Sequence, residues 1–173
     1  GIISILSGIF YTAGPRPLGY IGLGDLFVLI FFGPVAVGGT YFVQTYELNY
    51  AVVLAGFGPG LLAMAILAVN NYRDIESDQR SGKKTLAVRF GRTFAQYEYA
   101  GAILTAALIP VVIFLLIQDH TAILYSSIVG LFALPGIKIV FSSVEGPQLN
   151  QALAYTGKVL LIYSFLFSAG WIL

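Results

Sequence analysis

The chain has 173 residues, of which 58% are hydrophobic and only 10% are charged, whereas about a quarter of the residues of a soluble domain are charged. This composition excludes an ordinary water-soluble domain and predicts a membrane protein. The chain contains no cysteine, so disulfides and thiolate metal ligands are excluded, and any metal must be held by oxygen ligands.

The first apolar run, residues 1–11, begins with neither a methionine nor the basic stretch that opens a signal peptide. We interpret it as half of a membrane helix, and we expect the chain to be the C-terminal part of a longer protein. Five further apolar stretches each have roughly the 20 residues needed to cross a bilayer core about 30 Å thick. They are residues 26–44, 51–69, 97–117, 121–141 and 155–173. The sequence therefore predicts an all-α, polytopic transmembrane bundle of about six helices, in one domain over residues 1–173.

Glycine and proline occur inside four of these stretches, at residues 33–34, 58–60, 110 and 135–136. They would disrupt a soluble helix, but membrane helices tolerate them because neighbouring helices satisfy the freed backbone groups. We expect them to kink the helices around an internal cavity.

The basic residues fall on one side of this arrangement. When the connections alternate between the two membrane faces, all nine Lys and Arg lie on one side, in segments 12–25, 70–96 and 138–158. The opposite connections, residues 46–49 and 118–120, contain none. Because cytoplasmic loops carry an excess of Lys and Arg, the sequence predicts that segment 70–96 is cytoplasmic.

Segment 70–96 also carries a pattern typical of a metal site. Asn70, Asp74 and Asp78 are spaced i, i+4, i+8, so on a helix that continues past the membrane they share one face, which Asn71 joins. Two carboxylates four residues apart repel each other, which favours a cation between them. Mg²⁺ suits such a site, since it takes one or two carboxylates and completes its shell with water and phosphate oxygens. Basic side chains able to hold phosphate follow at Arg73, Arg80, Lys83 and Lys84.

The same segment has a simpler interpretation. Charged runs beside membrane helices usually set orientation, and the three acids, Asp74, Glu76 and Asp78, would then only balance the bases. The spacing alone does not decide between the two.

Residues 70–91 closely resemble the second Asp-rich motif of the UbiA-type intramembrane aromatic prenyltransferases. Residues 11–25 and 31–41 resemble the branch of this family that acts on 1,4-dihydroxy-2-naphthoate. The resemblance implies nine transmembrane helices around a central cavity that opens toward the cytoplasm, of which this chain would hold the last six. The family's first Asp-rich motif has no counterpart in the sequence, so half of the implied metal site is missing from it.

The resemblance further implies the reaction. A polyprenyl group passes from polyprenyl diphosphate to 1,4-dihydroxy-2-naphthoate with loss of CO₂, giving demethylmenaquinone for menaquinone synthesis, with Mg²⁺ as cofactor. The implied setting is a bacterial inner membrane, with the active site on the cytoplasmic face and no nucleic-acid partner.

The motif positions imply roles for individual residues. Asp74 and Asp78 would be the catalytic metal ligands. The diphosphate would be bound by Asn70, Asn71, Arg73, Lys83 and Lys84. The aromatic substrate would be bound by Arg16, Tyr20 and Asp25. For Arg16 and Asp25 a structural alternative is open, in which Arg16 sets topology and Asp25 caps the following helix.

Two other functions remain as alternatives. One keeps the family but changes the acceptor to 4-hydroxybenzoate, homogentisate or a porphyrin. The other is a membrane transporter subunit with interrupted helices. Transporters bind their solutes near the middle of the membrane, whereas the charges here cluster at one interface, which favours the enzyme.

Overall fold

The regular elements of the protein are all helices in a computed structural model, which describes residues 1–12 and 17–173. In chain order they are α1 (Ile2–Thr12), η1 (Leu18–Tyr20), α2 (Gly24–Phe31), α3 (Pro34–Thr45), α4 (Tyr50–Arg73), α5 (Ile75–Arg80), α6 (Leu86–Ile117), η2 (Thr121–Ile128), α7 (Val129–Phe132), α8 (Leu134–Ser142) and α9 (Gly146–Ile172). The η elements are 3₁₀ helices.

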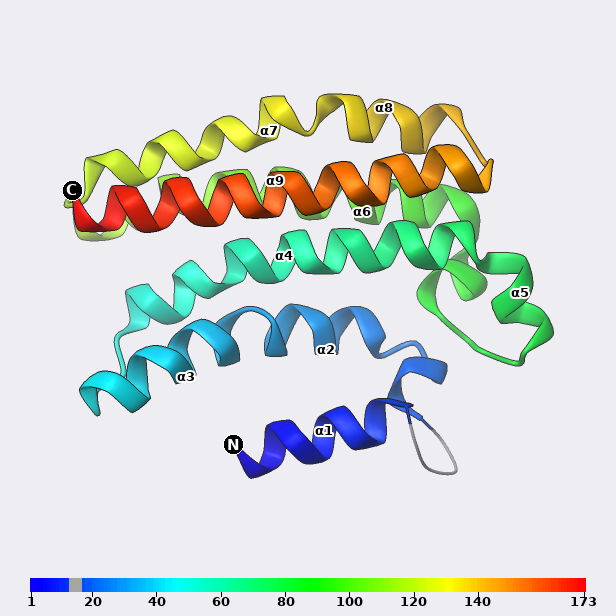
Figure 1. Ribbon diagram of the computed structural model, residues 1–173, viewed down its shortest axis with the longest axis horizontal. Helices are drawn as coiled ribbons and strands as arrows, with labels where there is room; N and C mark the ends of the chain where they lie inside the picture. The colour runs from blue at the N-terminus through cyan, green and yellow to red at the C-terminus, as the bar shows by residue number, and fades with distance from the viewer. Residues whose placement is uncertain (13–16) are drawn as a thin grey trace.

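These helices combine into five rods that are long and apolar enough to cross a membrane. The rods are residues 24–45, 50–73, 86–117, 121–142 and 146–172. They run side by side, with α4 between the α2–α3 rod and the helices α6 and α9 (Figure 1). The predicted all-α, polytopic bundle and its five membrane-spanning stretches are confirmed.

Two of the helices begin well before the predicted apolar stretches. Helix α6 starts at Leu86 instead of residue 97, and α9 starts at Gly146 instead of residue 155. Their first turns carry polar side chains such as Arg92 and Gln148. Hydrophobicity locates the part of a helix that crosses the bilayer core, and these polar turns lie before that part.

The predicted interruption at residues 33–34 is confirmed, and its cause is a close approach to α4. Gly33 has non-helical angles (φ −112°, ψ −111°), and Pro34 begins α3. A Cβ atom on Gly60 of α4 would lie 2.9 Å from the Cα of Gly33, and one on Gly56 would lie 2.8 Å from the nitrogen of Pro34. The Gly56-to-Gly60 spacing is the small-residue pattern that lets membrane helices approach closely.

The other predicted interruptions differ. Helix α4 continues through Pro59 and α6 through Pro110, while Pro135 lies in the first turn of α8, where proline fits. The sequence reasoning missed a break in α6 at Gly91, whose φ is 84°.

Small residues and polar side chains hold the helices of the bundle together. The buried alanines of α4 (Ala65, Ala68) and of α6 (Ala95, Ala102, Ala106) let these helices pack closely. The Tyr72 hydroxyl donates to the Ser143 carbonyl at 3.0 Å, and Gln96 donates to the Val140 carbonyl at 2.9 Å. These bonds fix the end of α4 against α6, α8 and the start of α9.

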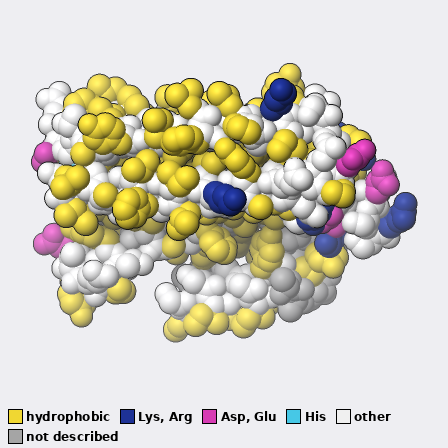
Figure 2. Space-filling view, turned by 45° about the horizontal axis from the view of Figure 1, so that its top comes forward, with side chains coloured by type: hydrophobic (Ala, Val, Ile, Leu, Met, Phe, Trp, Pro, Cys, Tyr) yellow, Lys and Arg dark blue, Asp and Glu magenta, His cyan; other side chains and the backbone are white. Residues whose placement is uncertain are grey.

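Charged side chains gather at the end of the bundle where α5 lies (Figure 2). The opposite end shows acidic side chains, from the connections that contain Glu47 and Asp119. This agrees with the predicted asymmetry, with one correction. The connection between α8 and α9 is only residues 143–145, so Lys138 and Lys158 lie within helices instead of the predicted 138–158 connection. Both are exposed, and long lysine side chains on a membrane helix can extend toward the interface.

The contact between α4 and the Gly33–Pro34 break predicts a stability effect. Gly56→Ala should lower the free energy of unfolding by about 1–3 kcal/mol, because the added methyl forces α3 and α4 apart. Gly101→Ala on α6 is the control, since a Cβ there meets nothing within 4 Å. Thermal unfolding of the full-length protein in detergent measures both, and equal midpoints for the two variants would contradict this account.

Candidate functional site

The predicted Asp-rich segment lies at the end of α4, but it is not one straight helix. Helix α4 ends at Arg73, and Asp74 (φ −98°, ψ 9°) joins it to the short α5. The Asp74 amide still donates to the Asn70 carbonyl at 3.0 Å, and the Asp78 amide donates to the Asp74 carbonyl at 2.8 Å. The helical spacing of the two acids therefore survives the break between α4 and α5.

Arg73 forms a bidentate ion pair with Asp74. Its Nε donates to Oδ1 at 2.8 Å and its Nη2 donates to Oδ2 at 2.7 Å. These charge-assisted bonds hold the pKa of the Asp74 carboxyl below its usual range, so Asp74 is ionised at neutral pH. Nη2 also donates to Asn70 Oδ1 at 2.8 Å, which places Asn70 in the same group.

Lys83 forms the second ion pair of the segment. Its ammonium donates to Asp78 Oδ1 at 2.8 Å, and the Asp78 side chain is buried. This bond raises the pKa of Lys83. Lys83 also helps to lower the pKa of Asp74, so the two ion pairs lie within electrostatic range of each other. The structure thus brings together Asn70, Arg73, Asp74, Asp78 and Lys83, five of the predicted site residues.

Tyr20 joins this group through the segment before α2. The Lys83 ammonium lies 5.4 Å from the centre of the Tyr20 ring, within the range of a cation–π contact. The Lys84 amide donates to the Tyr20 carbonyl at 2.8 Å, while the Lys84 side chain is exposed. Gly22 allows the approach, because its φ is 81° and a Cβ there would lie 2.7 Å from the Lys84 carbonyl oxygen.

Asn71 and Asp25 form a separate, buried pair. The Asn71 amide donates to Asp25 Oδ1 at 3.4 Å, so Asn71 does not join Asn70 on one face as the sequence predicted. Asp25 does not cap α2, because the N-cap position is Leu23 and carries no side-chain cap. The predicted Arg16 lies outside the described residues.

Sequence reasoning missed two polar residues near these groups. Glu98 of α6 is half-buried and within electrostatic range of Asp25, and a lone acid inside a long helix was the available signal. Asn150 of α9 accepts from Arg73 Nη1 at 2.6 Å. Nothing in the local sequence of Asn150 connects it to a residue 77 positions earlier.

The acidic side chains at this end of the bundle are few. Within the described ranges, His, Cys, Asp and Glu side chains form no group of three or more that could hold one. Asp74 and Asp78 nevertheless supply the one or two carboxylates that Mg²⁺ uses when phosphate oxygens and water complete its shell. Each carboxylate is already paired with a basic side chain, Asp74 with Arg73 and Asp78 with Lys83, so the site combines acidic and basic groups.

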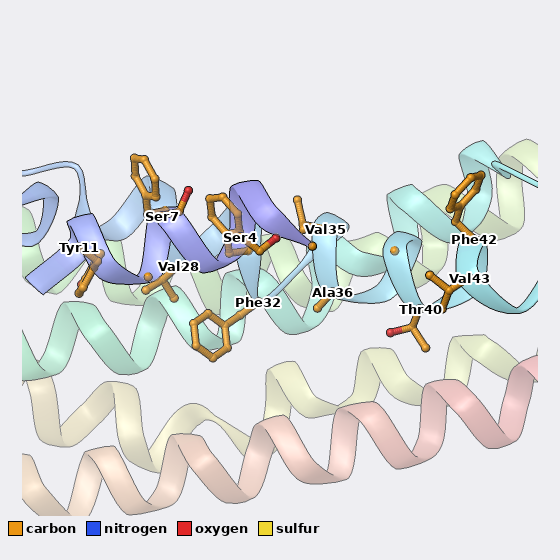
Figure 3. A pocket seen from close by; sticks show the side chains of 15 residues that line it. Ser4, Ser7, Tyr11, Val28, Phe32, Val35, Ala36, Thr40, Phe42 and Val43 are labelled. Atoms are coloured by element: carbon orange, nitrogen blue, oxygen red, sulfur yellow. The ribbon is translucent and has the colours of Figure 1, made fainter. Parts of the chain in front are cut away.

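An apolar groove starts beside this polar end and runs between α1 and the α2–α3 rod (Figure 3). Its volume is about 1060 Å³, and its lining includes Tyr11, Phe32 and Val43. Tyr11 stands at one end, where a Cβ on Gly24 would lie 3.0 Å from its hydroxyl, and it is within electrostatic range of Asp25 and Lys83. The groove therefore leads away from the polar site into the apolar part of the bundle.

Fold and site together define an integral, polytopic helical membrane protein with a polar site at one end of its helices and an apolar groove beside it. The chain belongs to the UbiA prenyltransferase family, whose sequence model matches residues 1–159. The family inferred from residues 11–41 and 70–91 is confirmed.

The chain is similar to several proteins of that family. It is 39% identical to the 1,4-dihydroxy-2-naphthoate octaprenyltransferase of Haemophilus influenzae, over 98% of this chain and 55% of that protein. It is 45% identical to the protein of the same name from Escherichia coli, over 70% of this chain and 39% of that protein. With UbiA prenyltransferase domain-containing protein 1 of Mus musculus it shares 35% identity, over 97% of this chain and 48% of that protein. The chain thus spans about half the length of the curated relatives it matches.

The docking of Tyr20 onto the segment around Lys84 predicts the effect of Gly22→Ala. The variant should lose about 1–3 kcal/mol for its left-handed backbone and more for the clash with the Lys84 carbonyl. Gly82→Ala separates the two effects, because Gly82 has a similar φ of 76° but a Cβ there meets nothing within 4 Å. In detergent, the free energy of unfolding of Gly22→Ala should be lower than that of Gly82→Ala. The reverse order would show that the close approach of Gly22 to Lys84 does not matter.

Proposed function

We propose that the protein transfers a polyprenyl group from polyprenyl diphosphate to 1,4-dihydroxy-2-naphthoate, with loss of CO₂, to give demethylmenaquinone. The observation that carries the proposal is the meeting of Asp74, Asp78 and Lys83 at one end of the bundle. The names of the similar bacterial proteins support this choice of acceptor. They do not favour 4-hydroxybenzoate or another aromatic acceptor.

UbiA prenyltransferases generally depend on a divalent metal, and here we propose Mg²⁺ held by Asp74 and Asp78. When bound, the metal neutralises the diphosphate so that it can leave. Arg73 keeps the Asp74 carboxyl ionised, and the ion pairs orient the carboxylates of both aspartates. Their spacing, one helical turn apart, suits a shared metal–diphosphate group.

The basic residues of the segment would hold the diphosphate oxygens. Lys83 pairs with Asp78 and lies within electrostatic range of Asp74, and the Lys84 side chain is exposed to solvent. Arg73 has five N–H donors, and within the described residues Asp74, Asn70 and Asn150 use four of them, which leaves one for phosphate. Asn70 supports this group through Arg73. We reassign Asn71 from the diphosphate to the support of Asp25.

The acceptor side of the site would involve Tyr20 and Asp25. Departure of the diphosphate leaves an allylic cation, which an aromatic face such as that of Tyr20 stabilises. Asp25 is buried and held by Asn71, with Glu98 within electrostatic range, and we propose that it accepts a hydrogen bond from a naphthoate hydroxyl. We propose that Arg16 pairs with the naphthoate carboxylate, as the sequence predicted.

The arrangement also supports a location. We propose that all 173 residues belong to one transmembrane domain of a bacterial inner-membrane protein, with the α5 end in the cytoplasm. The bases at that end and their scarcity at the opposite end agree with the positive-inside rule. Because the polar residues cluster at the bundle end and not at its middle, a transporter subunit is disfavoured.

Removal of the two carboxylates tests the proposed site. In the full-length protein with labelled polyprenyl diphosphate, naphthoate and Mg²⁺, Asp74→Asn/Asp78→Asn should lose at least about 100-fold in activity, since the metal contributes several kcal/mol. Chelation with EDTA should abolish turnover, and added Mg²⁺ should restore it.

Glu76→Gln is the matched control, because Glu76 lies between the two aspartates in the sequence but is exposed and pairs with Arg80 and Arg92. It should retain nearly full activity. Turnover that survives in the double variant would reduce the segment to a topology signal. Turnover with 4-hydroxybenzoate but not with naphthoate would move the protein to another branch of the family.

We further propose that the groove along α1 receives the polyprenyl chain, since its end at Tyr11 lies beside the diphosphate site. Gly39 lines the groove, and a Cβ there meets nothing within 4 Å. Gly39→Phe should therefore fill the groove without disturbing the fold.

The expected result is a rise of about tenfold in KM for a long polyprenyl donor, from the loss of roughly 1.4 kcal/mol of apolar contact, and little change for a ten-carbon donor. Gly101→Phe on α6 places the same ring on open space away from the groove. Equal KM values for the long donor in both variants would exclude this groove as the binding site of the chain.

A further inference from the structure

Arg73 is held by residues from two helices far apart in the sequence. Besides its ion pair with Asp74, its Nη2 donates to Asn70 Oδ1 at 2.8 Å and its Nη1 donates to Asn150 Oδ1 at 2.6 Å. Asn70 lies one turn before Arg73 on α4, whereas Asn150 lies in the first turns of α9. The guanidinium therefore has one carboxylate partner, Asp74, and two amide oxygen partners, one from Asn70 and one from Asn150.

The Asn150 side chain is exposed, but the backbone that carries it is well fixed. Its neighbours Leu149 and Ala152 are both fully buried, so the backbone of this turn of α9 is anchored in the core. Next to Arg73, the Tyr72 hydroxyl bonds the carbonyl of Ser143 just before α9. Tyr72 and Arg73, at the end of α4, thus both contact the α8–α9 region. Tyr72 does so through a buried hydrogen bond to Ser143, and Arg73 through its hydrogen bond to Asn150.

The planar guanidinium makes this arrangement directional. Arginine offers its donors in a rigid fork, so fixing Nη1 at Asn150 and one hydrogen of Nη2 at Asn70 sets the direction in which Nε and Nη2 point at Asp74. Without Asn150 the guanidinium keeps its bonds to Asp74 and Asn70 but loses its contact with α9, so Arg73 and Asp74 can shift together. The orientation of the Asp74 carboxylate relative to the rest of the site would then be less fixed.

We propose that Asn150 is a positioning residue for the metal–diphosphate site, acting through Arg73 on the orientation of the Asp74 carboxylate. The inference rests on the proposed function, because it assigns to Asp74 the role of metal ligand. It makes α9 part of the site, although α9 offers no acidic ligand there. Groups that orient a metal-binding carboxylate typically contribute 10–100-fold to metal affinity, so removing Asn150 should have an effect of about tenfold.

Three variants of the full-length protein separate this role from a general effect on folding. Asn150→Ala removes the acceptor oxygen, and Asn150→Asp keeps an oxygen acceptor at the same place. Gln151→Ala changes the exposed neighbour in the same turn of α9. Thermal unfolding in detergent checks that all three are folded.

Two measurements are made on each variant. The first is the Mg²⁺ concentration that gives half-maximal prenyl transfer, beside the KM for naphthoate. The second is independent of turnover: titration of Mn²⁺, followed by its electron paramagnetic resonance signal, in the presence of an unreactive polyprenyl thiodiphosphate.

Asn150→Ala should raise both the half-maximal Mg²⁺ concentration and the Mn²⁺ dissociation constant about tenfold and leave the KM for naphthoate unchanged. Gln151→Ala should stay close to wild type, and Asn150→Asp, which keeps the acceptor oxygen but adds a negative charge beside Arg73, should bind Mn²⁺ more tightly than Asn150→Ala. Unchanged Mn²⁺ binding in Asn150→Ala overturns the proposal, and so does a rise in the naphthoate KM without a change in metal affinity. If the wild-type protein binds Mn²⁺ but does not prenylate naphthoate, the proposed function fails while the Mn²⁺ titration still decides the role of Asn150.

Discussion

The site depends on two neighbouring ion pairs, Arg73–Asp74 and Lys83–Asp78, at the end of a membrane helix. Carboxylates one helical turn apart repel each other, and Asp78 is buried. The repulsion and the burial would both destabilise the fold without a compensating positive charge. The two bases supply that charge, and Arg73 keeps Asp74 ionised. A metal–diphosphate group can then replace these ion pairs without leaving a charge unpaired. The metal pairs with the acids, and the phosphate oxygens pair with the bases.

The rest of the bundle keeps these ion pairs in place. Small residues let α4 lie close to α6 and to the Gly33–Pro34 break, and this brings the segment with Tyr20 beside the end of α4. Most of this fold could be predicted, because about 20 apolar residues are needed to cross a bilayer. The starts of α6 and α9, and the placement of Lys138 and Lys158, could not, since hydrophobicity does not mark where a polar turn begins a helix.

The residues of the candidate site could be proposed from the sequence more readily than their contacts. The i, i+4 spacing pointed to Asp74 and Asp78 and the upstream block to Tyr20, and the structure places Tyr20 beside Lys83. The spacing did not reveal that α4 stops at Arg73 or that Asn71 turns toward Asp25. Nor could it find Asn150, because contacts between distant helices depend on how the helices pack and leave no local pattern.

The most direct test is an experimental structure of the full-length protein with Mg²⁺ and an unreactive polyprenyl thiodiphosphate. We expect a metal bound to oxygens of Asp74 and Asp78 at about 2.1 Å, with Lys83 moved onto a phosphate oxygen. A metal–diphosphate group bound elsewhere, with both ion pairs unchanged, would contradict it.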